Sequence, residues 1–107
     1  MILAHVEYRY APAAEDAMRS LVPDVERYSR GFDGCQSFAL SFPADRPGVL
    51  LGTEVWTDAA SLRAHVAVAH DAAELEPWHR LLSGMDASLF TGERISLEQL
   101  QAGDVAR

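Results

Sequence analysis

The chain has 107 residues, of which 49% are hydrophobic, and its formal net charge is −7 at pH 7. This length predicts a single domain over residues 1–107, with its core in residues 2–95 and a short C-terminal extension in 96–107. The acidic balance argues against nucleic acid and anionic membranes as partners, because binding phosphate groups requires a basic face.

The counts of lysine and cysteine exclude some kinds of catalysis and indicate a compartment. Every basic residue is arginine, which excludes a lysine nucleophile or Schiff base, and the single cysteine, Cys35, can form no internal disulfide. An unpaired cysteine suits a reducing compartment. The first ten residues carry charge, unlike a signal peptide, and no run approaches the roughly 20 apolar residues of a membrane helix. We therefore expect a cytoplasmic protein.

The N-terminal third predicts a strand followed by a helix. Residues 2–10 alternate between two faces, which is the period of a strand. Residues 13–30 place apolar side chains at helical spacing, with Glu15 and Asp16 where the first turn favours acidic groups. Pro23 removes a hydrogen-bond donor inside this run, so we expect either a kink or two shorter helices.

The remaining elements follow in the same way. The pattern predicts two strands, over residues 35–42 and 49–56, joined by a turn over 43–48 that contains Pro and Gly. This arrangement predicts a hairpin. Thr57 or Asp58 can cap a helix over 59–67, and a second helical piece covers 71–83. A last strand is expected over 86–95, and the spacing of Ser96 and Gln99 predicts a capping box on a short helix over 96–101.

The resulting order, β-α-β-β-α-β, predicts an α+β protein with a ferredoxin-like fold, in which a four-stranded antiparallel sheet carries helices on one face. The strand 49–56 is largely apolar on both of its faces. One layer of helices can cover only one face, so we expect a second copy of the chain to cover the other. This predicts a homodimer.

Several residues together resemble a known family. Gly34 and Cys35 open the second strand, Trp56 closes the third, and the next helix carries His65, with His70 five residues further on. This pattern resembles the antibiotic biosynthesis monooxygenase superfamily of dimeric α+β barrels, and its quinol-monooxygenase-like members most. The resemblance implies a monooxygenase that uses no cofactor and no metal to oxidise an electron-rich aromatic (a quinol, anthrone or related polyketide) with O2.

The resemblance also implies roles for individual residues. It assigns Trp56 to the wall of the substrate pocket and places Gly52 where the anthrone-oxidising members have asparagine. The haem-degrading branch has asparagine, tryptophan and histidine at positions that here hold Tyr8, His65 and Leu75. These three replacements argue against haem degradation.

His65 is the first candidate for the catalytic base, because an imidazole titrates near working pH. The alternative is a structural histidine that fixes the strand-to-helix corner. His70 is either a pocket residue or a structural residue at a helix junction. Trp56, Tyr8 and Trp78 are candidates for the substrate-binding wall, and plain core packing is equally compatible with each of them.

The other candidates are weaker. His5 lies opposite Tyr8 on its strand and is expected at the dimer interface, and His79 is expected to be exposed. On one helix His65 and His70 would point about 140° apart, and His70 with Glu74 lacks a third ligand, so we expect no metal site.

Two alternatives to the oxygenase remain open. The same barrel could bind a small apolar ligand without catalysis. It could also be an isomerase, cyclase or decarboxylase that uses the same histidine for proton transfer alone. Nucleophilic catalysis by Cys35 is not expected, since no activating partner is evident.

Overall fold

The computed structural model describes residues 1–103, so positions 104–107 of the expected C-terminal extension lie outside the described residues. The strands and helices, in chain order, are β1 (Ile2–Tyr10), η1 (Pro12–Ala14), α1 (Glu15–Arg30), β2 (Cys35–Ser41), β3 (Val49–Trp56), α2 (Ala59–Ala69), η2 (Ala73–Leu75), α3 (Glu76–Leu81), β4 (Leu82–Thr91) and α4 (Leu97–Gln101).

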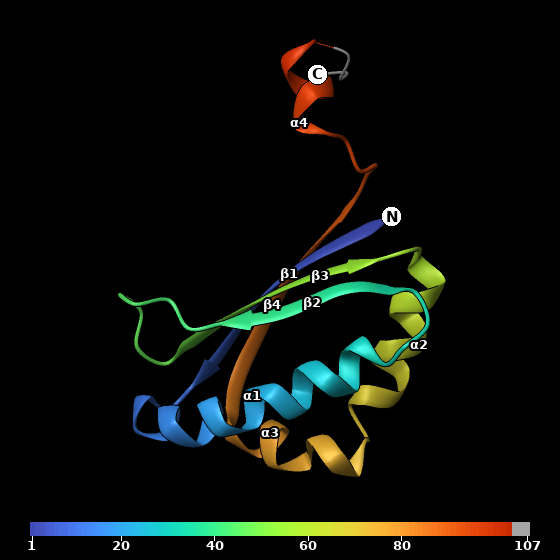
Figure 1. Cartoon of the computed structure of the whole chain (residues 1–107). Helices are drawn as coiled ribbons and strands as arrows, with labels where there is room; N and C mark the ends of the chain where they lie inside the picture. Colours follow the sequence, from blue (N-terminus) through green and yellow to red (C-terminus); the bar gives the residue numbers. More distant parts are fainter. Residues whose placement is uncertain (104–107) are drawn as a thin grey trace.

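The sheet has four strands in the order β2-β3-β1-β4, and each neighbouring pair is antiparallel. Helices α1, α2 and α3 lie on one face of this sheet (Figure 1). The predicted α+β, ferredoxin-like fold is therefore confirmed. Its topology brings the two chain-terminal strands, β1 and β4, side by side.

Helix α1 is one helix that continues through Pro23, so the alternative of two shorter helices was wrong. The helix buries Met18, Val22 and Val25. Packing of this apolar stripe offsets the hydrogen bond that Pro23 cannot donate, because tertiary contacts rather than propensity supply most helix stability.

The predicted boundaries after β3 need correction. The helical piece expected over 71–83 is split into η2 and α3 and ends at Leu81, and β4 starts at Leu82 rather than at residue 86. Leu82 pairs with Tyr10 of β1 across a register shift. A short apolar run fits a helix or a strand equally well from its pattern, and here strand pairing decides.

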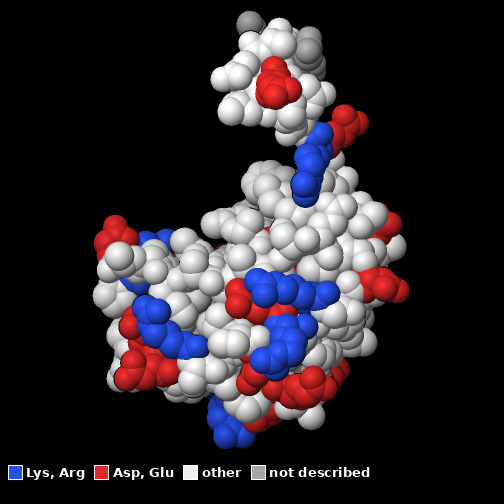
Figure 2. All heavy atoms as spheres, viewed as in Figure 1, with Lys and Arg blue, Asp and Glu red and all other residues white. Residues whose placement is uncertain are grey.

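The inner face of the sheet carries the core, and its largest fully buried side chains include Trp56, Met18 and Leu50. Charged side chains of both signs are intermingled on the face of the molecule shown in Figure 2. On α1, for example, Arg19 pairs with Glu15 at 3.2 Å. Such exposed pairs contribute little to stability.

The outer face of the sheet differs between its two ends. At one end Leu3 of β1 lies between Val55 of β3 and Phe90 of β4, forming an apolar row. At the other end Arg9 pairs with Asp86 at 2.6 Å. The outer face is therefore apolar at one end and charged at the other.

Beyond β4 the chain leaves the sheet and forms α4, which stands apart from the other helices (Figure 1). The predicted capping box is present: Gln99 N–H donates to Ser96 Oγ at 3.0 Å, and Ser96 N–H donates to Gln99 Oε1 at 2.8 Å. Leu97 and Leu100 of α4 are exposed. Within the described residues, no helix has the length and apolar character that crossing a membrane requires.

Candidate functional site

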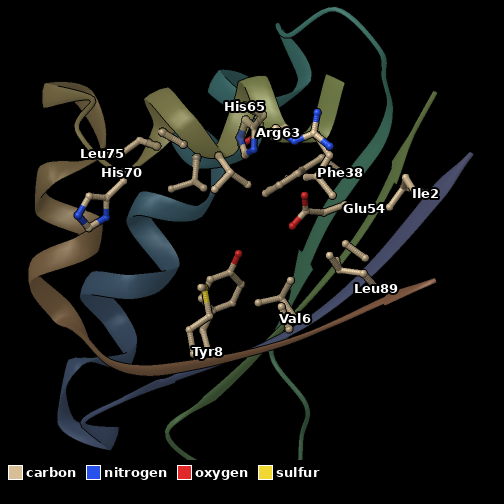
Figure 3. Close-up of a pocket in the computed structure, with 18 of the residues that line it drawn as sticks. Ile2, Val6, Tyr8, Phe38, Glu54, Arg63, His65, His70, Leu75 and Leu89 are labelled. Carbon is tan, nitrogen blue, oxygen red and sulfur yellow. The ribbon is translucent and has the colours of Figure 1, made fainter. Parts of the chain in front are cut away.

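A cavity of about 920 Å³ lies between the inner face of the sheet and helices α1, α2 and α3. Most of its lining is apolar, with Val6, Phe38, Leu75 and Leu89 among the wall residues (Figure 3). Ligand sites of this kind are mostly apolar with a few placed polar groups. The polar and charged residues that line this cavity are Tyr8, Ser29, Glu54, Arg63, His65, His70, His79, Ser83 and Thr91.

The cavity opens along the edge strand β4. Met85 and Leu89 line it, yet their exposed fractions are 58% and 60%. In the register with β1, Met85 and Leu89 pair with Tyr8 and Ala4, both inner-face residues. The two side chains therefore belong to the helix-covered face but extend beyond the helices that cover it.

Glu54 contributes a buried carboxyl to this cavity. Strand periodicity places Glu54 and Trp56 on the same face of β3, and Glu54 is only 5% exposed. Trp56 Nε1–H donates to Glu54 Oε1 at 2.9 Å. Burial raises the pKa of Glu54, and the Trp56 hydrogen bond opposes that rise by favouring the charged form.

His65 lies directly beneath the same indole. Asp58 caps α2, its carboxylate accepting from Ser61 N–H at 2.8 Å, so α2 starts directly after β3 and His65 faces the core. The imidazole is 8% exposed, and its centroid lies 4.8 Å from that of Trp56. Its Nε2 lies 3.1 Å from Ser29 Oγ.

The other nitrogen of this imidazole, Nδ1 of His65, is buried and has no hydrogen-bond partner among the described residues. Burial lowers the pKa of His65, because desolvation disfavours the charged ring. The site therefore holds a neutral imidazole at neutral pH.

Tyr8 and Trp78 form the wall across the cavity from α2. Tyr8 is 9% exposed and Trp78 is 3% exposed, and their rings meet edge to face with centroids 5.6 Å apart. Burial, with a smaller contribution from the Glu54 charge, raises the pKa of Tyr8. Its phenol stays protonated and can donate a hydrogen bond into the cavity, toward which it points in Figure 3.

Of the residues predicted for the site, Tyr8, His65, His70 and Trp78 line the cavity. Trp56 and Gly52 do not. Trp56 is 0% exposed, and Glu54 and His65 lie against its ring. The indole therefore affects the cavity through these two residues.

Gly52 is occluded for a different reason. A Cβ at this position would lie 3.2 Å from atoms of both Tyr8 and Leu40. A larger residue at position 52 would therefore require Tyr8 and Leu40 to shift by a few tenths of an ångström.

The remaining histidines lie near the cavity opening or on the outer face. His70 ends α2 and is exposed, and its ring centroid is 5.7 Å from that of His79. His79 was expected to be exposed, but it is half-buried because its Nε2 bonds to the Ala69 carbonyl at 3.0 Å. His5 is exposed on the outer face, as its position in the strand predicted.

No group of three or more His, Cys, Asp or Glu side chains within residues 1–103 is arranged to hold a metal ion. Cys35 is half-buried, with its Sγ 3.7 Å from the Ser37 carbonyl oxygen. Burial raises the pKa of the Cys35 thiol, which disfavours the reactive thiolate.

Glu54 was not predicted from the sequence. Its signal was present: a single acidic residue in phase with Leu50 and Trp56, on the face of an apolar strand that must be buried. A carboxylate is rarely fully buried without a partner, so this position marks a group whose burial requires an explanation.

The fold is shared with several solved structures. A Deinococcus radiodurans protein named for the antibiotic biosynthesis monooxygenases is 21% identical, with a TM-score of 0.76 over 91% of this chain and 98% of its own. Rv0793 from Mycobacterium tuberculosis is 22% identical, with a TM-score of 0.72 over 89% of this chain and 97% of its own.

A further similar structure is that of a variant of SnoaB, a cofactor-independent oxygenase from Streptomyces nogalater. It is 18% identical, with a TM-score of 0.68 over 88% of this chain and 94% of its own. No protein with a curated functional description matches the sequence. The family model for antibiotic biosynthesis monooxygenases matches residues 1–73, more than half of the sequence, and the chain belongs to that family.

Proposed function

We propose that this protein is a cofactor-independent monooxygenase that oxidises an electron-rich aromatic, namely a quinol, an anthrone or a related polyketide, with O2. The observation that carries the proposal is the apolar cavity of about 920 Å³, into which Tyr8, Glu54 and His65 bring its few inner polar groups. Membership of the family, and the shared fold of the cofactor-independent oxygenase SnoaB, support the same reaction class.

The chemistry needs a proton acceptor and an apolar enclosure. Removing a proton from the substrate hydroxyl gives an electron-rich anion, which passes one electron to O2, and the resulting radical pair forms a carbon–oxygen bond. The peroxide then takes up a proton, its O–O bond breaks, and the carbon loses its hydrogen. One oxygen atom remains in the product as a carbonyl and the other leaves as water.

Two groups that line the cavity have the chemistry of a proton acceptor, the imidazole of His65 and the carboxylate of Glu54. Apolar walls such as Phe38 and Leu75 would exclude water, which otherwise intercepts reactive intermediates. Tyr8 would orient the substrate as a hydrogen-bond donor.

Oxygen consumption tests the proposal. Chelator-treated protein should raise O2 uptake by 1,4-dihydroxynaphthalene or anthrone well above autoxidation, with one O2 consumed per carbonyl formed. Rates equal to autoxidation for both compounds would contradict it. A product formed without O2 would identify proton-transfer chemistry, and a co-purified ligand that is never converted would identify a binding protein.

We also propose that the protein works as a homodimer. The apolar row of Val55, Leu3 and Phe90 on the outer face supports this, with Leu3 38% and Phe90 55% exposed. A second copy presenting the same row would bury it, as two-fold symmetric interfaces do.

A further inference from the structure

We propose that Glu54 accepts the proton from the substrate hydroxyl, and that Trp56 is a positioning residue that holds this carboxylate in place. The inference deepens the proposed function and rests on it. It assigns the basic role to a residue of β3 and leaves His65 a supporting one.

The orientation of the Glu54 carboxyl is the first argument. Its Oε1 accepts the Trp56 Nε1–H at 2.9 Å, while Oε2 has no hydrogen-bond partner among residues 1–103. Glu54 lines the cavity, and Figure 3 shows its carboxyl group directed into the open space between α2 and the sheet. One oxygen is thus fixed and the other is free to meet a ligand.

The surroundings of His65 are the second argument. Nε2 is occupied by Ser29 Oγ, and Nδ1 is enclosed by protein. The ring packs against Trp56 and Phe32, with centroids at 4.8 Å and 5.0 Å. A general base must come within hydrogen-bond distance of the proton that it removes, and neither nitrogen can do so without movement of α2 or of the ring.

The charge environment is the third argument. The titratable groups that face Glu54 are Tyr8 of β1, Cys35 of β2 and His65 of α2, and Arg63 of α2 lines the same cavity. Within the described part of the chain, no arginine or histidine forms an ion pair with Glu54. A carboxylate without a counter-charge in an apolar site is a stronger base than one in water.

The proton transfer balances within the site. The substrate O–H bond breaks, the proton moves to Glu54 Oε2, and the electron pair stays on the substrate oxygen. The protonated carboxyl returns that proton to the peroxide anion formed with O2, which restores the carboxylate for the next turnover.

The test compares Glu54→Gln with His65→Gln and Trp56→Phe, using O2 uptake with 1,4-dihydroxynaphthalene. Glu54→Gln should lower kcat by about 100-fold or more with little change in KM, whereas His65→Gln should lower it by less than about tenfold. Trp56→Phe should move the acidic limb of the kcat/KM profile to higher pH. The Trp56 hydrogen bond favours the charged carboxylate, so its loss raises the pKa of Glu54.

Binding of 2-naphthol, measured without O2, separates this inference from the proposed function. Wild-type affinity should rise with pH as Glu54 ionises, and Glu54→Gln should abolish this rise. Circular dichroism checks that each variant is folded. Oxygenase activity that survives in Glu54→Gln would overturn the inference and leave the function standing. Binding that depends on Glu54, without O2 uptake, would keep Glu54 as the proton acceptor and reject the oxygenase function. A wild-type protein with neither Glu54-dependent binding nor O2 uptake would reject both proposals.

Discussion

His65 shows how burial sets the behaviour of a single side chain. A histidine whose native pKa is lowered binds fewer protons when folded than when unfolded, so folding stability rises with pH through its titration range. Stability is therefore lost as the pH falls below the ordinary histidine pKa of about 6.5 toward the lower native value.

Replacing His65 with Gln should remove this dependence. Between pH 7 and pH 5 the wild-type free energy of unfolding should fall more steeply than that of His65→Gln, as measured by urea unfolding followed by tryptophan fluorescence. His70→Gln is the matched control, because His70 is exposed at the end of α2 and its replacement should leave the slope unchanged. Equal slopes in all three proteins would show that His65 is not desolvated.

Glu54 has the opposite effect on how folding stability depends on pH. Its native pKa is raised, so the folded state holds the proton more tightly, and stability falls as the pH rises above the ordinary glutamate value of about 4.3. Glu54→Gln should be more stable than the wild type at pH 8 and indistinguishable from it at pH 4. Thermal unfolding at the two pH values measures this. A variant less stable at pH 8 would indicate that the carboxylate is well compensated.

Tyr8, His65, His70 and Trp78 were predicted for the site and line the cavity, whereas Glu54 was not predicted. Tyr8 and Trp78 were recognisable because large aromatics on buried faces border either core or cavity. Trp56 was assigned to the wall, but which of two neighbouring inner-face residues reaches a cavity depends on side-chain rotamers. The hydrogen bond from Trp56 to Glu54 turns the carboxyl toward the cavity and leaves the indole behind it.

Among the elements, α1 contains the clearest departure from local preference. Pro23 is exposed in the middle of this helix. Replacing Pro23 with Ala restores a backbone donor to the preceding turn and should raise the free energy of unfolding by about 1–3 kcal/mol. Chemical denaturation measures it, with Ser20→Ala as a control that changes the same helix without adding a donor. A destabilised Pro23→Ala would show that the helix has adapted to the proline.

The element order was predictable because alternation and turn residues are local signals. The limits of β4 were not, since its start at Leu82 depends on pairing with Tyr10, some 70 residues away along the chain. The bounds of α2 and the capping box of α4 followed from short-range side-chain chemistry and were predicted to within about two residues.

At the scale of the whole molecule, the apolar row on the outer face leads to a test of self-association. Leu3→Asp should place a charge in the proposed interface and shift the protein from dimer to monomer. Light scattering after size-exclusion chromatography measures the mass. Val68→Asp is the control, because Val68 is 48% exposed on α2 and lies outside the cavity lining. A wild-type protein of monomer mass would reject the dimer.

The opening of the cavity along β4 has a consequence for how efficiently oxygen is used. A quinol radical formed beside an unsealed edge can lose superoxide to solvent, and the products are then quinone and hydrogen peroxide. Because Met85 and Leu89 leave this edge exposed, some hydrogen peroxide should be released for each quinol consumed. The peroxide yield would thus serve as a measure of how well this edge is closed.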